Sequence, residues 1–145
     1  MIFYTQCLIR EPVLDLPNFC NLIQLQLGFE YLDIRVLIGM LHNCPKLQAL
    51  KNYPLEKVPS YASYVWTQPI NIPNCIISHL NTVEYQGYRN TAVEHEFAAY
   101  ILQRGLVLKT MTIHTNFIRR RKKHKIWWVL YKIPRGSSMC RIKVD

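Results

Sequence analysis

Glycine is scarce in this sequence, and the short motifs that carry most enzyme chemistry are absent. Only 5 of the 145 residues are glycine, and none belongs to the G-x-G-x-x-G or P-loop patterns that cradle phosphates. The motifs G-x-S-x-G and H-E-x-x-H do not occur either. The histidines are scattered along the chain, at His42, His79, His95, His114 and His124. We therefore expect no catalytic residue and no cofactor, and predict that the protein is not an enzyme.

Closely spaced cysteines and long apolar runs are also missing. The cysteines lie at long and irregular intervals, at Cys7, Cys20, Cys44, Cys75 and Cys140. No C-x-x-C pair or Cys/His group has zinc spacing, so we expect no metal site and small buried thiols in a reducing compartment. No apolar run approaches the roughly 18 residues that suggest a membrane span. The first residues lack the pattern of a secretory signal, so a nuclear or cytoplasmic location is expected.

Acidic residues are nearly absent from the last third of the chain. Residues 1–96 hold 6 Lys/Arg and 8 Asp/Glu, whereas residues 97–145 hold 12 Lys/Arg and only Asp145. This asymmetry raises nucleic acid, an acidic partner or nuclear import as possibilities. A solvated helix face is the structural alternative. The cations concentrate in Arg119, Arg120, Arg121, Lys122, Lys123 and Lys125, a possible basic patch or nuclear localisation signal.

The basic segment leads into an apolar stretch. Helical spacing joins Ile126, Trp127, Leu130 and Ile133, which predicts a helix packed on the rest of the fold. Cations are unfavourable at the positive end of a helix, so the spacing predicts a helix that starts near Lys123, with 119–122 as loop. With Trp127 in the core, Trp128 and Tyr131 are the exposed aromatics that a single-stranded nucleic acid would need.

A recurring pattern of strands and helices dominates the rest of the chain. The spacing apolar-x-x-apolar-x-apolar is typical of leucine-rich repeats, and it predicts parallel strands near 24–27, 48–51, 82–85 and 110–113. Residues 33–43, capped by Asp33, and 92–104 have the periodicity of helices. A partial repeat with a strand within 3–9 and a final edge strand over 140–144 complete the pattern. The anchor leucines are Leu22, Leu47, Leu80 and Leu108.

The proline-rich residues 52–73 interrupt this series, and we interpret them as an inserted loop. Its aromatic residues are expected to pack onto the last repeat. They are Tyr61, Tyr64 and Trp66.

The helix over 91–104 has the clearest local signals. Thr91-x-x-Glu94 fits a capping box, in which each side chain bonds the backbone N–H of the other residue. Gly87 indicates the turn before the helix, and Gly105 after Arg104 predicts an end in the left-handed conformation. The predicted apolar stripe consists of Val93, Phe97 and Ile101, with Tyr100 beside them.

The second half of the chain carries an ordered set of short motifs: Trp66-x-x-Pro69, residues 72–80 (IPNCIISHL), 82–84 (TVE), 87–88 (GY), 100–102 (YIL), 107–113 (VLKTMTI) and 133–140 (IPRGSSMC). This set resembles the FBD domain found at the C-terminus of many plant F-box/leucine-rich-repeat proteins. Each piece alone is weak, but the ordered set is specific.

The resemblance implies an α/β fold: a partial leucine-rich-repeat solenoid of the ribonuclease-inhibitor kind, continued by a βα unit, with a parallel sheet and helices on its convex side. Residues 1–65 would be terminal repeats with a connecting loop, and 66–145 the FBD domain. It further implies the substrate-recognition region of an SCF-type E3 ubiquitin ligase, whose repeat surface binds an unknown target protein. No F-box-like helical segment precedes the repeats, so binding of a Skp adaptor is not expected. The alternative is a basic protein that binds nucleic acid or another anion through residues 119–132.

Overall fold

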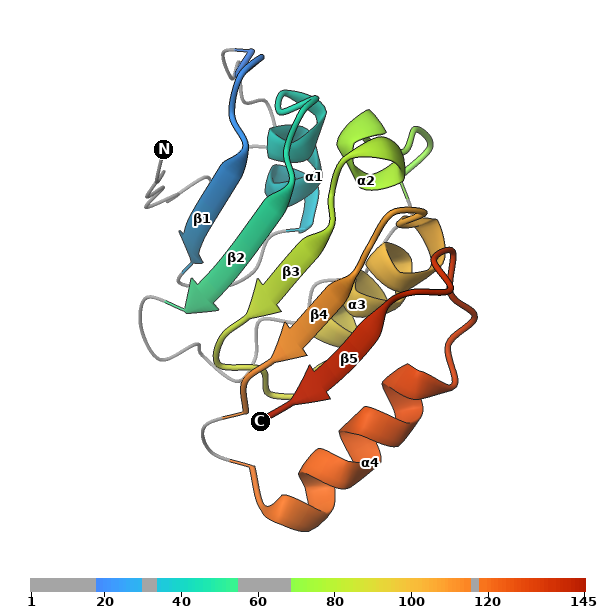
Figure 1. The fold of residues 1–145 in the computed structure, drawn as a ribbon. Helices are drawn as coiled ribbons and strands as arrows, with labels where there is room; N and C mark the ends of the chain where they lie inside the picture. The colour runs from blue at the N-terminus through green and yellow to red at the C-terminus, as the bar shows by residue number, and fades with distance from the viewer. Residues whose placement is uncertain (1–17, 30–33, 55–68, 116–117) are drawn as a thin grey trace.

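Five parallel strands lie side by side in the order of the chain, β1-β2-β3-β4-β5 (Figure 1). The computed structural model describes residues 18–29, 34–54, 69–115 and 118–145. The strands are β1 (Gln24–Phe29), β2 (Ala49–Pro54), β3 (Thr82–Tyr85), β4 (Thr110–Ile113) and β5 (Arg141–Val144). The helices are α1 (Ile34–His42), α2 (Asn74–Ser78), α3 (Ala92–Arg104) and α4 (Arg120–Tyr131). The protein is therefore α/β, and the parallel order expected for the strands is confirmed.

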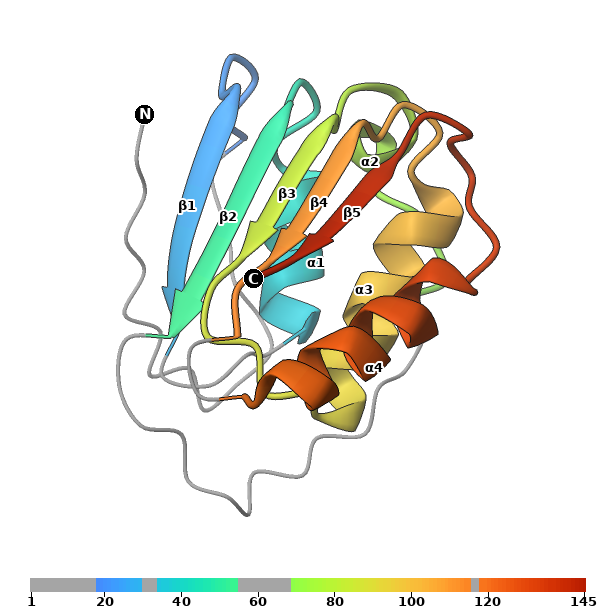
Figure 2. The same cartoon turned by 60° about the horizontal axis from the view of Figure 1, so that its bottom comes forward.

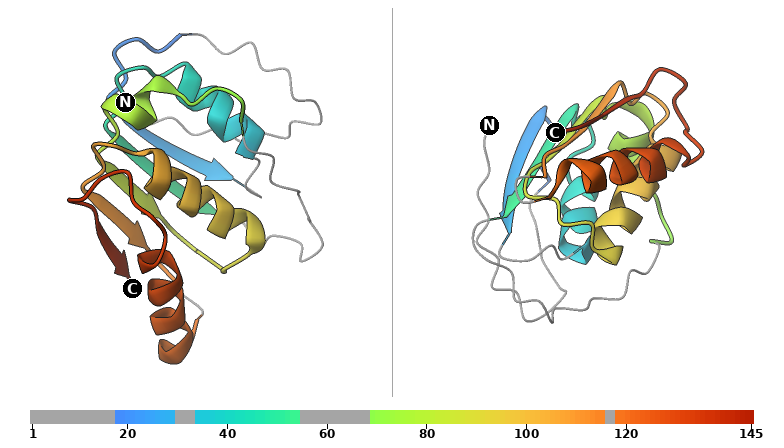
Figure 3. Two further views of the ribbon diagram at one scale, coloured as in Figure 1. Left: turned by 90° about the vertical axis from the view of Figure 1, so that its right-hand side faces the viewer. Right: turned by 90° about the horizontal axis from the view of Figure 1, so that it is seen from below.

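All four described helices lie on one side of the sheet, as Figures 2 and 3 show. They form a row in which α1 contacts α2, α2 contacts α3, and α3 contacts α4, while α4 also packs against β5. A sheet with helices on one face buries alternate side chains of each strand and leaves the others open. The sequence alternates accordingly. The buried side chains include Leu25 and Leu27 of β1, Leu50 of β2, Val83 and Tyr85 of β3, and Met111 and Ile113 of β4.

The same local geometry recurs before the first four strands. Each of these strands begins two residues after one of the anchor leucines Leu22, Leu47, Leu80 and Leu108, and all four of these are buried. The backbone carbonyl one residue after each of the first three anchor leucines accepts hydrogen bonds from two backbone N–H groups. These belong to the first residue of the next strand and to the residue before it. These bonds run from Gln48 and Ala49 to Ile23, from Asn81 and Thr82 to Gln48, and from Lys109 and Thr110 to Asn81. The even spacing of the strands therefore follows from one repeated hydrogen-bond pattern.

The capping box predicted for α3 is present. The Thr91 hydroxyl accepts the Glu94 backbone N–H (3.3 Å), and Glu94 Oε1 accepts the Thr91 backbone N–H (3.0 Å). The buried Glu94 carboxylate also accepts the Arg89 backbone N–H, at 3.1 Å to Oε1 and 3.2 Å to Oε2. Phe97 and Ile101 are buried and Val93 packs beside them, so the predicted stripe is confirmed. The carboxylate thus fixes both the helix start and the loop before it.

Replacing Thr91 by alanine should lower the free energy of unfolding by about 0.5–2 kcal/mol, because a helix N–H loses its acceptor. Thr91→Ser keeps the hydroxyl and serves as the matched control, with a smaller expected change. Urea denaturation of both variants measures the difference. An alanine variant as stable as the serine variant would show that the hydroxyl contributes nothing to the cap.

Gly87 before α3 and Gly105 after it differ in their backbone conformation. Gly87, in the turn after β3, has φ 67°, which agrees with the predicted turn. Gly105 has φ −78° and ψ 96°, so the predicted left-handed end of α3 is wrong. A Cβ at Gly105 would lie 2.8 Å from the carbonyl oxygen of Ile101. Glycine fits this position because the chain passes close to the last turn of the helix, not because of its own torsion angle.

Helix α4 starts earlier than predicted. It begins at Arg120, with Arg119 as a cap that makes no side-chain hydrogen bond, so the expectation of a loop over 119–122 is wrong. Arg and Lys are strong helix formers, and the cost of each cation at the helix start is only about 0.3–1 kcal/mol and is screened by salt. Burial of Ile126 and Leu130 on the fold outweighs that cost.

Two further differences concern the interrupted region. Helix α2, which packs Cys75 and Ile76 into the core, was not predicted. Strand β2 extends to Pro54, past the point where the inserted loop was expected to begin. Residues 69–73 contain neither helix nor strand, as predicted. Four predictions lie outside the described residues: the strand within 3–9, the cap at Asp33, the buried thiol of Cys7 and the packing of Tyr61, Tyr64 and Trp66.

Strand β5 forms one edge of the sheet, as predicted, with Arg141 and Lys143 exposed. The backbone groups of Arg141 and Asp145 bond towards β4. Because alternate residues of a strand bond to the same neighbour, the backbone groups of Ile142 and Val144 point outward. The Ile142 carbonyl accepts a hydrogen bond from the Trp127 indole (3.1 Å), and the Cys140 carbonyl accepts one from Arg135 (2.6 Å). Side chains from α4 and the segment after it therefore occupy acceptors at this edge.

Candidate functional site on the open face of the sheet

The face of the sheet opposite the described helices carries short or polar side chains in cross-strand rows. The strand register places Gln24, Ala49, Thr82, Thr110 and Arg141 in one row, and Gln26, Lys51, Glu84, Thr112 and Lys143 in the next. All of these are exposed or half-buried. Because parallel strands in register bring side chains of successive strands about 4.8 Å apart, the rows form a continuous surface that a partner can contact.

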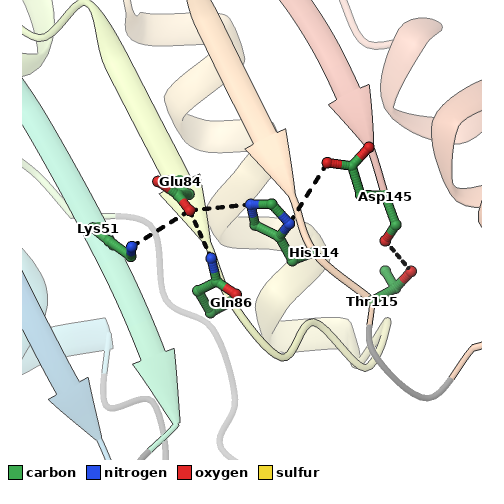
Figure 4. Close-up of polar contacts among 6 residues, drawn as sticks. All are labelled: Lys51, Glu84, Gln86, His114, Thr115 and Asp145. Carbon is green, nitrogen blue, oxygen red and sulfur yellow. Dashed lines mark hydrogen bonds and ion pairs between the residues drawn. The ribbon is translucent and has the colours of Figure 1, made fainter.

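A cluster of polar side chains lies on this face, towards the carboxyl ends of β3, β4 and β5 (Figure 4). Glu84 Oε1 accepts hydrogen bonds from Gln86 Nε2 (2.6 Å) and from His114 Nε2 (3.0 Å), and it lies 3.6 Å from Lys51 Nζ. The other ring nitrogen of His114, Nδ1, lies 3.6 Å from Asp145 Oδ2. The cluster joins β2, β3 and the segments that follow β4 and β5. It fixes the orientation of side chains that would otherwise be free on an open surface.

The chain order of the cluster shows why sequence analysis did not find it. Glu84 and His114 lie 30 residues apart, and they meet only because β3 and β4 pair in register. The alternation of buried and exposed residues in β3 places Glu84 on the open face. Its contact with His114 can be predicted only when the register of β3 and β4 is known.

The cluster has the chemistry of a structural network. The shared Glu84 oxygen is already surrounded by donors, and no hydroxyl or thiol nucleophile stands against His114 in the described contacts. Among the residues that the structure describes, no group of three or more His, Cys, Asp or Glu side chains could hold a metal ion. The described contacts hold the side chains of Glu84 and His114 in place on the open face of the sheet.

The cysteines give no reactive thiol in the core. Cys44, Cys75 and Cys140 are free and buried, as predicted, whereas Cys20 is exposed, which corrects that prediction for this residue. Burial raises the pKa of Cys44 to about 11 and that of Cys75 to about 12. Burial also raises the pKa of Cys140, against the opposing effect of Arg135. Such thiols are protonated near neutral pH and are poor nucleophiles.

The predicted basic patch lies at the start of α4, away from the polar cluster. Five of its six cations are exposed and Lys123 is half-buried. None takes part in an ion pair with the rest of the described chain. The structure thus brings the patch together on one helix end: Arg119, Arg120, Arg121, Lys122, Lys123 and Lys125.

Aromatic rings follow these cations along α4. Trp127 is partly buried against the core, whereas Trp128 and Tyr131 are exposed, in agreement with the sequence pattern. The ring of Trp127 stacks on Tyr131 (centroids 4.8 Å apart, 18° between planes) and on His124 (6.3 Å, 19°). The Arg135 guanidinium lies 4.9 Å from the Tyr131 centroid. The helix therefore carries an ordered stack beside its basic start.

The sheet, the row of helices and the open polar face define a βα protein with an exposed strand surface. The family model of the FBD domain matches residues 68–113, from the segment before α2 to the end of β4. No solved structure matches the chain.

Curated proteins of Arabidopsis thaliana match most of the chain. One FBD-associated F-box protein is 30% identical over 132 residues, which cover 89% of this chain and 27% of the relative. A putative FBD-associated F-box protein is 31% identical over 143 residues, or 92% of this chain and 33% of the relative. An F-box/FBD/LRR-repeat protein is 31% identical over 115 residues, or 76% and 26%.

These matches confirm the resemblance read from the motifs: the chain carries an FBD domain and is a relative of the plant FBD-associated F-box proteins. It spans about a quarter to a third of the length of these relatives. No helix in the described part of the chain is both long and apolar enough to span a membrane.

Proposed function

We propose that this chain is a protein-interaction module: the substrate-recognition region of an F-box/leucine-rich-repeat protein that serves an SCF-type ubiquitin ligase. The open face of the sheet would bind the target protein, and the chain would have no catalytic role of its own. The observation that carries the proposal is the set of cross-strand rows, whose polar centre is fixed by Glu84 and His114. The names of the relatives support the placement among F-box proteins.

The repeated geometry before the strands supports a leucine-rich-repeat solenoid as the finer description of the fold. Buried anchor leucines and the recurring pair of backbone bonds are what such a stack requires, because each repeat buries its apolar side only against its neighbours. In the proposed division, residues 1–65 contain terminal repeats with a connecting loop, and 66–145 form the FBD domain. Strand pairing between β2 and β3 joins the two parts into one sheet.

Residues 1–145 alone should fail to bind a Skp adaptor in a pull-down, whereas the same residues fused to an upstream F-box should bind. The apolar side chains of the helices, such as Leu37 and Leu41 of α1 and Phe97 and Ile101 of α3, are buried in the fold. Exposing them to an adaptor would forfeit roughly 1.5–3 kcal/mol per side chain, and the loss for all four together is comparable to the whole stability of a marginally stable domain. Adaptor binding by residues 1–145 alone would overturn the proposal and assign recruitment to this chain.

A second candidate function, binding of nucleic acid or another anion through residues 119–132, is favoured by the exposed cations of α4. The same cations are the basis for proposing nuclear import, with a cytoplasmic location as the alternative. Salt-dependent retention on DNA or RNA would support nucleic-acid binding.

Nuclear import is tested with a fluorescent fusion in which the six cations are replaced by alanine. Loss of nuclear accumulation would support import through these cations, and an unchanged distribution would refute it.

A further inference from the structure

A stripe of exposed side chains runs along the outer side of α4. Arg121, Lys125, Trp128 and Lys132 follow one another at i, i+4, i+7 and i+11, which is the spacing of one helix face. The buried residues Ile126 and Leu130 lie on the opposite face. Trp128 stands between cations and is 45% exposed, although indole is among the largest apolar groups a surface can present. We call these four residues the α4 stripe.

The α4 stripe forms no ion pair with an acidic residue of the described part of the chain. Asp145 is the one acidic residue after residue 96, and it lies beside His114 on the open face of the sheet. The ion pairs in the described part of the chain involve none of the stripe's cations. The first turn of α4 holds no acidic residue either. A partner that brings carboxylates would relieve the mutual repulsion of these cations.

The rings of α4 are arranged for a protein partner rather than for nucleobases. Trp127 is stacked on both His124 and Tyr131. Tyr131 also packs against the Arg135 guanidinium, whose central carbon lies 4.9 Å from the ring centroid, so two groups already lie against this ring. Single-stranded nucleic acids need free aromatic faces for stacking. The stack therefore leaves few platforms for bases.

Trp128 is held in one orientation. Its indole N–H donates to His124 Nε2 (2.9 Å), and its ring stands nearly perpendicular to Trp127 (78°) and Tyr131 (84°). Lys132 Nζ lies 6.0 Å from the ring centroid. An exposed aromatic residue that is already fixed loses little conformational entropy on binding, which is the property of an interface anchor.

We propose that the α4 stripe docks an acidic segment of a partner protein, with a large apolar side chain of that segment on Trp128 and its carboxylates on Arg121, Lys125 and Lys132. The charge of the stripe selects the carboxylates, and the fixed ring selects the apolar residue between them. This inference goes beyond the proposed function. It uses a helix rather than the open face of the sheet, and it holds whether or not the chain serves a ubiquitin ligase.

The test measures binding of fluorescent peptides to the full 145-residue chain by anisotropy at physiological salt. The probe is a peptide in which Asp and Glu flank one Phe. Its comparators are the same peptide with Ser in place of Phe, and a single-stranded oligodeoxynucleotide of equal charge. The Phe peptide should bind more tightly than both.

Trp128→Ala should weaken binding of the Phe peptide by about tenfold or more, as for a central aromatic anchor. Trp128→Phe should restore most of the affinity. The double change Lys125→Glu with Lys132→Glu should weaken binding by about tenfold. The change Lys109→Glu, at an exposed residue outside α4, should alter binding by less than about twofold. Circular dichroism checks that each variant keeps its helices.

Several results would overturn the proposal. One is tighter binding of the oligonucleotide, lost in the same variants, which would favour the nucleic-acid function. Equal binding of the Phe and Ser peptides, or of Trp128→Ala and the unchanged chain, would leave only diffuse charge attraction. Absence of saturable peptide binding would remove the site altogether.

Discussion

Replacing Phe97 by alanine is expected to lower the free energy of unfolding by about 3–5 kcal/mol. Phe97 is 1% exposed and lies at the centre of α3, where its ring meets Tyr85 of β3 (centroids 6.5 Å apart). The substitution removes the apolar contact that joins the helix to the middle strand. It also leaves a cavity, because helix and sheet cannot close fully around a smaller side chain.

Urea denaturation measures this loss, with Phe97→Leu as the matched control. Leucine keeps most of the apolar volume, so its cost should stay below about 1.5 kcal/mol if the neighbouring side chains repack. Val93→Ala, on the half-buried side of the same helix, provides a second comparison. A Phe97→Ala variant whose free energy of unfolding falls by less than about 1 kcal/mol would contradict the observed burial, since truncation of a core phenylalanine costs more than that.

Replacing Asn52 by leucine should raise the free energy of unfolding by about 1–3 kcal/mol. Asn52 is 1% exposed, and neither amide atom of its side chain has a hydrogen-bond partner among the described residues. Its neighbours across the sheet are Leu27 of β1 and Tyr85 of β3. In the pattern of the repeats Asn52 occupies the position that Leu27 and Ile113 hold in their own strands.

Leucine has the same branched skeleton of side-chain heavy atoms as asparagine, although its methyl groups are bulkier, and it needs no hydrogen bond. Where the neighbouring side chains accommodate the extra volume, it removes the desolvation penalty and gains apolar burial. Thermal or urea denaturation of the variant measures the gain. The matched control is Asn52→Asp, which keeps the shape but places a charge in the same apolar surroundings and should destabilise strongly. A destabilising leucine variant would mean that the amide has a partner that offsets its burial.

The strand positions could be predicted because their signals are local. Leu22, Leu47, Leu80 and Leu108 fall at the same offset from four successive strands, and the spacing of apolar residues after them has the period of a pleated strand. Hydrogen-bond partners at a helix start are also local, which is why Thr91 and Glu94 identified the capping box correctly. Such features depend on neighbours three or four residues away.

Features that depend on packing were harder to predict. Helix α4 starts at Arg120 rather than near Lys123 because the burial of Ile126 and Leu130 outweighs the cost of cations at the positive end of the helix dipole. The short α2 has only one turn, and Pro73 before it was interpreted as loop although proline is favoured at helix starts. The end of α3 was misassigned because a glycine can serve close approach as well as a left-handed torsion angle.

For the candidate sites, the sequence shows which polar and charged residues are present, but it does not show which of them come into contact. The cations of α4 are adjacent in sequence, so the patch was predicted residue by residue. The contacts of Glu84 with Lys51, Gln86 and His114 require the register of β2, β3 and β4, which no local pattern states. The stack of His124, Trp127 and Tyr131 lies between these cases, because helical spacing predicts proximity but not ring orientation.

The hydrogen bonds that Trp127 and Arg135 donate at the β5 edge bear on whether another strand can pair there. A parallel sheet with strands in chain order could in principle accept a further strand from another molecule at each edge, and exposed strand edges are sites of aggregation. The Trp127 indole and the Arg135 guanidinium already occupy outward carbonyls of this edge, those of Ile142 and Cys140. An incoming strand would have to break both bonds and displace α4 before it could pair. The helix that carries the basic charge thus also closes one edge of the sheet against intermolecular strand addition.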